Sequence, residues 1–316
     1  MNEQRRARAL AAMADAGLDA LILGREANAR YVSGARRLWL ANARAFAPGC
    51  VLVASGDVHL LSTSDDGIPA DIPLERLYPI TWNPASLMAR LAAIPDLTSA
   101  RRIGVDSLTP FMDAQLSTTF PSAELADGQT PMLAARREKL PEEIDAIGRA
   151  CVVARRALDD VTTELRSGVR ERDLLARFEQ RMCELGTTTP AFEGTFGHTF
   201  AGDRVLESRD RVVLDVGVLV DGYEGGLART IVCGDPQPSN TPADERLAAL
   251  LPTVRPGPAG ADLDDALSIG LGVEAPVAPG DVLTAGMVLS LRVDVDGWVR
   301  RAIVAVTDDG GQPLDG

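Results

Sequence analysis

Apolar residues in the first 130 positions alternate between helical and strand spacing. Leu10 and Met13 lie at helical spacing, which predicts a helix from Arg5 to Ala16, ended by Gly17. Helical spacing returns between Ser86 and Ala93. Four short runs predict buried strands: Ala20–Leu23, Cys50–Val53, Val58–Leu61 and Arg102–Asp106. Strands that alternate with helices predict a compact α/β domain.

The pattern changes near Arg136, where helical spacing begins and continues to about Leu165. A second helix is predicted from Glu171 to Leu185. A β-hairpin is predicted around Asp296-Gly297, and a Pro- and Ser-rich loop begins at Asp235. We therefore divide the chain into two domains, 1–132 and 133–316.

Composition and charge narrow the classes of function. Hydrophobic residues make up 46% and charged residues 24% of the chain, as in ordinary globular proteins. The formal net charge of -13 argues against nucleic acid or an anionic membrane as a partner. The N-terminal residues contain no apolar signal core, and the four cysteines show no Cys-x-x-Cys spacing. We expect a cytoplasmic protein with reduced, mostly buried thiols that acts on a small molecule.

Residues 212–230 have the sequence VVLDVGVLVDGYEGGLART. This run resembles the metal-binding hairpin of the creatinase, prolidase and aminopeptidase P family, the pita-bread metallopeptidases. Residues 17–21, 28–34 and 136–147 resemble other segments of the same family. The resemblance implies an α/β (α+β) protein in which an N-terminal creatinase-like domain precedes a pita-bread domain. That second domain is shortened between 235 and 285, where the family places two long helices and its metal-ligating His.

The family holds a pair of divalent cations with two Asp, one His and two Glu. By the resemblance, the two Asp positions fall on Asp215 and Gly226, and the two Glu positions on Arg292 and Arg301. The His position is either deleted or falls near Val273-Glu274. A two-metal site needs a cluster of anionic oxygens, and arginine neither deprotonates usefully nor attracts a divalent cation. Two carboxylates have become guanidinium groups, and the sequence therefore predicts neither a metal pair nor any other cofactor.

The two arginines have two interpretations. Arg292 and Arg301 either clamp a carboxylate or phosphate of a ligand, or pair with Asp215 and neighbouring acids and fill the former metal site. Glu224 lies two residues before Gly226, so it either shares a strand face with that position or faces solvent. We include Asp215 as a catalytic candidate and Arg292, Arg301 and Glu224 as substrate-binding candidates.

One histidine and one tryptophan, His198 and Trp39, complete the candidate site. His198 corresponds to the family's substrate-side His, which is not a metal ligand and serves creatinase as a proton shuttle; otherwise it is an ordinary loop histidine. Trp39 lies where N-terminal domains of the family reach over a neighbouring subunit's pocket, or it packs in its own domain. The resemblance thus implies a homodimer, with His198 as acid/base and Trp39 as a substrate-binding lid.

The sequence leaves two functions open. The first is a metal-independent hydrolase or lyase of this superfamily, acting on a small, anionic, amino-acid-like substrate by hydrolysis or elimination at a C–N bond. The second is a non-catalytic pseudopeptidase that serves as a binding or scaffold protein. Loss of the acidic ligands excludes an ordinary dinuclear Xaa-Pro peptidase.

Overall fold

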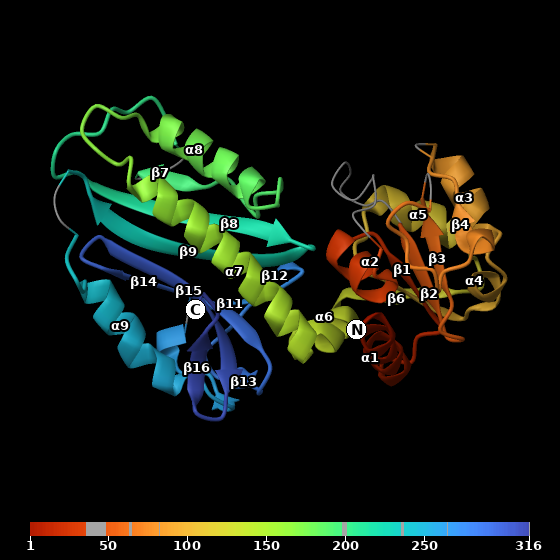
Figure 1. Cartoon of the computed structure of the whole chain (residues 1–316). Coiled ribbons are helices and arrows are strands. Elements are labelled where there is room, and N and C mark those ends of the chain that lie inside the picture. Colours follow the sequence, from red (N-terminus) through yellow and green to blue (C-terminus); the bar gives the residue numbers. More distant parts are fainter. Residues whose placement is uncertain are drawn as a thin grey trace. The chain divides into compact units, whose positions relative to one another are not determined.

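The computed structural model describes residues 1–35, 49–62, 65–81, 83–197, 201–234, 237–263 and 265–315. The chain forms two compact units, Met1–Arg137 and residues 138–316 (Figure 1). The division lies after Arg137, whereas the sequence pattern placed it after residue 132. Helix α6 (Gln129–Arg137) contacts α1 (Asn2–Asp15), and this packing keeps α6 within the first unit.

The first unit is built on a six-stranded sheet of order β4-β3-β2-β1-β5-β6. Its strands are β1 (Ala20–Leu23), β2 (Cys50–Val53), β3 (Val58–Leu61), β4 (Leu77–Tyr78), β5 (Arg102–Val105) and β6 (Glu124–Asp127). Its other helices are α2 (Glu26–Ser33), α3 (Pro84–Ala92), α4 (Pro95–Ser99), α5 (Pro110–Thr119) and the 3₁₀ turn η1 (Leu74–Arg76). The predicted α/β domain is confirmed, with β1 paired antiparallel to β2 and parallel to β5.

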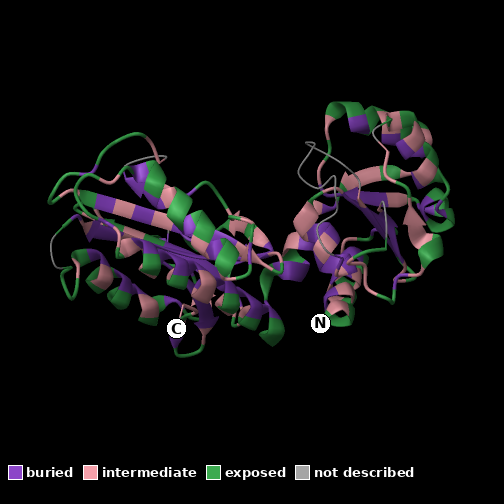
Figure 2. Cartoon of the chain, turned by 45° about the horizontal axis from the view of Figure 1, so that its top comes forward, coloured by how far each residue is buried: buried purple, intermediate pink, exposed green. Residues whose placement is uncertain are grey.

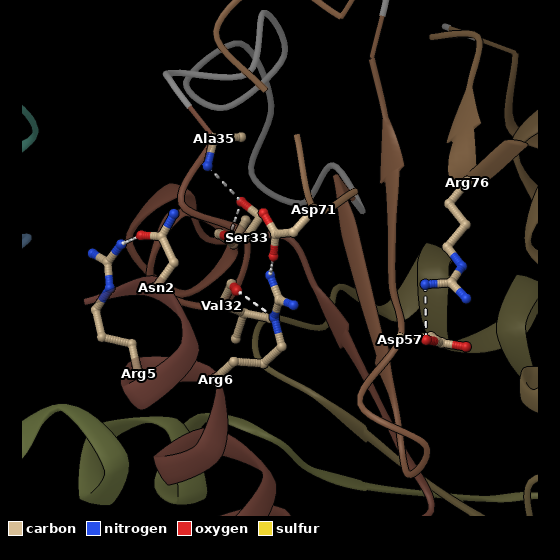
Figure 3. A network of polar contacts seen from close by, with 10 residues as sticks. Asn2, Arg5, Arg6, Val32, Ser33, Ala35, Asp57, Asp71 and Arg76 are labelled. Atoms are coloured by element: carbon tan, nitrogen blue, oxygen red, sulfur yellow. Dashed lines mark hydrogen bonds and ion pairs between the residues drawn. The ribbon is translucent and has the colours of Figure 1, made fainter. Parts of the chain in front are cut away.

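Polar contacts join the helices of this unit to its loops (Figure 3). The Arg6 guanidinium donates to Val32 O at 3.2 Å and to Asp71 Oδ2 at 2.9 Å, which ties α1 to the end of α2. An ion pair of 2.8 Å between Arg76 and Asp57 links η1 to the β2–β3 turn. These contacts hold peripheral segments and involve no candidate site residue.

The second unit contains an eight-stranded sheet of order β12-β11-β14-β15-β9-β8-β7, with β16 paired to β15. Its strands are β7 (Thr195–Gly197), β8 (Arg211–Val220), β9 (Tyr223–Val232), β11 (Leu267–Gly270), β12 (Gly272–Pro276), β14 (Val288–Val295), β15 (Trp298–Thr307) and β16 (Gly310–Pro313). The strands β10 (Gly257–Pro258) and β13 (Val282–Leu283) form a separate pair. The helical elements are α7 (Pro141–Thr162), α8 (Glu171–Glu184), α9 (Pro242–Leu250) and the short turns η2 (Leu251–Thr253) and η3 (Ala261–Leu263).

The continuous helix predicted from Arg136 to Leu165 was wrong, because two helices occupy this stretch. Helix α6 ends at Arg137 and α7 begins at Pro141. Leu140 has φ -68° and ψ 154°, since a residue that precedes proline is driven away from helical angles. Proline then suits the first turn of α7, where its missing N–H costs no hydrogen bond.

One face of the large sheet is covered by helices. Apolar side chains at alternate positions of β8 pack against α7 and α8 in a buried cluster (Figure 1). A second cluster packs α9 against β14 and β15. Figure 2 shows the strands largely buried and the helices exposed on their outer sides. The residues between these apolar positions project to the opposite face of the sheet, which we call the site face.

Tight turns fix the register of the two long hairpins. Asp221 and Gly222 have φ of 51° and 81°, and Asp296 and Gly297 have φ of 52° and 78°. Two successive positive φ values identify type I′ turns, whose twist suits paired antiparallel strands. In the segment predicted to be shortened, the described residues contain α9, short 3₁₀ turns and four short strands. Among the described helices, none combines the length and apolarity needed to cross a membrane.

Candidate functional site

The sheet places five residues in one row on the site face. Thr195 of β7 pairs with Asp215 of β8, which pairs with Ala228 of β9. Ala228 in turn pairs with Arg301 of β15, and Arg301 pairs with Arg292 of β14. Directly paired residues of antiparallel strands project to the same face. Arg301 and Asp215, which are 86 positions apart in the sequence, therefore lie on the same face of the sheet.

Arg301 reaches across Ala228 and pairs with Asp215. Its Nε and Nη2 atoms donate to Asp215 Oδ1 at 2.9 and 2.7 Å, and Nη2 also donates to Val216 O at 2.9 Å. The two side chains are only 8% and 18% exposed, and the guanidinium carbon lies 5.2 Å from the centre of the Phe192 ring. The methyl group of Ala228 is small enough to leave this path open. The result is a partly dry, charge-assisted pair that spans three strands.

Gly226, where the resemblance places the family's second Asp, has no room for a side chain. A Cβ atom there would lie 2.4 Å from Val216 O and 2.9 Å from Arg301 Nη2. A Cβ at neighbouring Gly225 would lie 2.2 Å from Cys151 N, within the backbone of α7. The two glycines therefore have separate tasks: Gly225 allows α7 to approach β9, and Gly226 leaves space beside the Arg301 guanidinium.

Glu224 lies on the site face and is buried, with 4% relative exposure. Burial raises the pKa of its carboxyl above the ordinary value of 4.5, while the charge of Arg301 and a hydrogen bond from the Val273 N–H lower it. The charge of Asp215 acts in the same direction as burial. The structure thus brings Glu224, Asp215 and Arg301 into one electrostatic neighbourhood.

Arg292 differs from Arg301, although the two are directly paired. Its side chain is exposed and makes no hydrogen bond or ion pair within the described part of the chain. Arg292 and Asp215 are three strand spacings apart, about 14 Å between Cα atoms. Asp294 projects to the same face two residues further along β14, and its Oδ1 accepts a turn hydrogen bond from Gly297 N at 3.1 Å. Like charges directly opposite one another in a sheet are unfavourable, so the row leaves an uncompensated cation beside Arg301.

His198 and Trp39, the proposed acid/base and lid, lie outside the described residues. The other histidine, His59, belongs to β3, where Nδ1 lies 3.2 Å from Tyr78 Oη and burial lowers the pKa of the ring.

Two features of this unit were missed from the sequence. Phe192 packs on Arg301, and no sequence periodicity indicates this contact. Glu274 forms a nearly fully buried ion pair with Lys139, with Nζ–Oε2 of 2.7 Å. Ser268 Oγ donates to the same oxygen at 3.0 Å. The positive charge of Lys139 thereby compensates the negative charge of the Glu274 carboxylate, and no sequence pattern indicates this pair.

Comparison with known proteins assigns both units. Residues 5–137 match the model of the creatinase/prolidase N-terminal domain, and residues 145–269 match that of metallopeptidase family M24. The chain belongs to this creatinase/prolidase/M24 family. Its mixed α/β architecture, an N-terminal domain followed by a pita-bread domain, is the predicted one.

Individual relatives agree with this assignment. The chain is 24% identical over 300 residues to an Xaa-Pro dipeptidase of Pyrococcus horikoshii, which covers 90% of this chain and 80% of that protein. It is 36% identical over 106 residues to an Xaa-Pro dipeptidase of Pyrococcus furiosus, a match spanning only 31% of this chain and 30% of that protein. The solved structure of the P. furiosus prolidase superposes with a TM-score of 0.78 at 20% identity over 98% of both chains. At that identity the structural likeness shows the fold.

Proposed function

We propose that this chain is a metal-independent enzyme of the creatinase/Xaa-Pro peptidase superfamily that acts on a small, anionic, amino-acid-like molecule. The observation that carries the proposal is the pair between Arg301 and Asp215. The resemblance implies that both residues stand at metal-ligand positions of the family. A guanidinium that is fixed to the sheet here supplies the positive charge that a cation supplies in a metallopeptidase.

The residues present do not fit a pair of divalent cations. Such a pair needs several anionic oxygens and an open position for water. The Arg301 guanidinium already donates to the Asp215 oxygen Oδ1, and Gly226 has no space for a ligating side chain. In the part of the chain that the structure describes, no cluster of three or more His, Cys, Asp or Glu side chains could hold a metal ion.

The anionic substrate class rests on Arg292. Arg292 is exposed and is directly paired with a second arginine, Arg301. The one acidic residue of β14, Asp294, already accepts a turn hydrogen bond from Gly297 N. A ligand carboxylate at Arg292 would offset the repulsion between the two guanidinium groups and gain charge-assisted hydrogen bonds.

The reaction class rests on the relatives. They are named Xaa-Pro dipeptidases, which supports cleavage at a C–N bond by hydrolysis or elimination. In this proposal His198 transfers the proton, because imidazole changes its charge near neutral pH. Asp215, held by Arg301, orients and polarises the bound molecule.

A second candidate function is a non-catalytic pseudopeptidase. The burial of Arg301 favours this function, because its side chain is only 8% exposed and pairs with Asp215 rather than facing solvent. In that case the arginine stabilises the former metal site, and the site face serves for binding alone.

Three measurements on the full chain separate these functions. Elemental analysis after dialysis against Mn²⁺, Co²⁺ or Zn²⁺ should find no stoichiometric metal, and two ions per chain would refute the proposal. The protein should be incubated with free amino acids, dipeptides and N-carbamoyl amino acids, and the mixtures analysed by mass spectrometry. We expect a product that still forms when a metal chelator is present and that His198→Ala no longer forms. Binding without any product would favour the pseudopeptidase.

The arginine assignment has a matched control. Arg292→Ala should weaken the binding of a small carboxylate probe, such as a dipeptide with a free carboxylate, measured by saturation-transfer NMR. Arg255→Ala removes another exposed arginine of the same unit, outside the row on the site face, and should leave binding unchanged. Equal effects of the two substitutions would show that only overall charge matters, and would remove the reason for an anion site at Arg292.

A further inference from the structure

The Arg301–Asp215 pair leaves one hydrogen-bonding group unused on each partner. Both donors that Arg301 directs to Asp215 meet the same oxygen, Oδ1, and Nη2 also serves Val216 O. Within the described residues, Arg301 Nη1 has no acceptor and Asp215 Oδ2 has no donor. Asp215 keeps 18% of its side chain exposed. A cationic donor and an anionic acceptor of one ion pair therefore remain available side by side.

We infer that the site face binds the zwitterionic head group of a free amino acid, with the ammonium at Asp215 Oδ2 and the carboxylate between Arg301 Nη1 and Arg292. This inference rests on the proposed anion site and specifies its ligand class. The α-ammonium and carboxylate of an amino acid are separated by a single carbon, so both fit beside groups that belong to one hydrogen-bonded pair.

Charge complementarity favours a zwitterion over a simple anion. A carboxylate bound at Arg292 and Arg301 lies near the Asp215 carboxylate, and the two negative charges repel. An ammonium on the same molecule converts that repulsion into a charge-assisted hydrogen bond. An amine without a carboxylate is repelled by the positive charges of Arg292 and Arg301, whose residues are directly paired on β14 and β15.

Apolar groups beside the pair indicate the rest of the ligand. The Phe192 ring covers the Arg301 guanidinium and is 37% exposed. Val273, whose N–H bonds Glu224, is 53% exposed on β12. These exposed surfaces near the charged row favour an amino acid with an apolar side chain, which would remove both from water.

The test compares matched ligands on the full chain by isothermal titration calorimetry. Each apolar L-amino acid is measured with the acid that lacks its amino group and the amine that lacks its carboxylate; for leucine these are 4-methylpentanoate and 3-methylbutylamine. We expect at least one amino acid to bind about tenfold or more tightly than both of its analogues. Equal binding of amino acid and acid, still dependent on Arg292, would overturn the zwitterion while the anion site stands. No binding by any compound would overturn both.

Substitutions identify the ammonium acceptor. Asp215→Asn keeps an oxygen for Arg301 and removes the negative charge, and it should abolish the preference for the amino acid over the acid. Asp294→Asn removes a carboxylate on the same face that already serves Gly297 N, and it should retain that preference. Circular dichroism and unfolding curves show whether each variant is folded. Loss of the preference in Asp294→Asn but not in Asp215→Asn would overturn the assignment.

Discussion

The Arg301–Asp215 pair should be a strong local contribution to the stability of the second unit. Removing one partner of a buried ion pair costs about 3–5 kcal/mol, because the remaining charge loses its compensation. Asp215 is 18% exposed, so water recovers part of this cost for Arg301→Ala, and we expect a loss of about 2–4 kcal/mol in the free energy of unfolding. Removing both side chains should cost less than the sum of the single changes.

A double-mutant cycle measures this coupling directly. The variants Arg301→Ala, Asp215→Ala and the double variant should give a coupling energy of about 2 kcal/mol. The matched control is the pair between Arg229 of β9 and Asp159 of α7, at 2.8 Å but with side chains 27% and 45% exposed. Its coupling energy should be about 0.5 kcal/mol, as for solvent-exposed pairs.

The assay is urea unfolding followed by tryptophan fluorescence. The chain has three tryptophans, and replacing Trp39 and Trp82 by Phe leaves Trp298 of β15 as the reporter of the second unit. The slope of the free energy against urea should stay constant among the variants, so that midpoint shifts report stability. A coupling energy for Arg301–Asp215 no larger than that of Arg229–Asp159 would refute the role assigned to the pair.

Further outcomes can be measured on the same protein. Burial raises the pKa of Glu224 above its ordinary value of 4.5, so ionisation of this carboxyl destabilises the folded protein as the pH rises through the raised pKa. Glu224→Gln should therefore raise the free energy of unfolding above about pH 5 and have little effect below pH 4.5. Urea unfolding curves from pH 4 to 8 check this. Gly225→Ala should cost about 3 kcal/mol or more, since its Cβ would meet the α7 backbone at 2.2 Å, and a thermal midpoint within a few degrees of the parent protein would contradict it. Ala228→Leu should displace Arg301 and lower the free energy of unfolding. Arg292→Ala changes an exposed side chain and should leave that free energy within about 0.5 kcal/mol of the parent protein. Light scattering should give a homodimer, and a monomer mass at micromolar concentration would count against that proposal.

The sequence predicted those elements that local chemistry fixes. Alternating apolar positions around Asp296-Gly297 predicted the last hairpin, and the family resemblance predicted the hairpin at 212–234; both are confirmed, each with successive positive φ values in its Asp-Gly turn. Helix α5 was missed, although Thr109 caps it and Pro110 occupies its first position. The short strands β6, β7 and β16 were also missed, since each is stabilised by pairing with its neighbours more than by its own pattern.

What the sequence alone determined about the site is the set of residue types at the aligned positions: one Asp, one Gly and two Arg. What only the tertiary structure decided is how they are used. Strand β15 lies against β9, far away in sequence, and this pairing puts Ala228 between Arg301 and Asp215, so that one arginine is buried in an ion pair. Arg292, one strand further from Asp215, is exposed. Residue identity fixes charge and hydrogen-bonding capacity, but burial and pairing depend on long-range register, which no local pattern encodes.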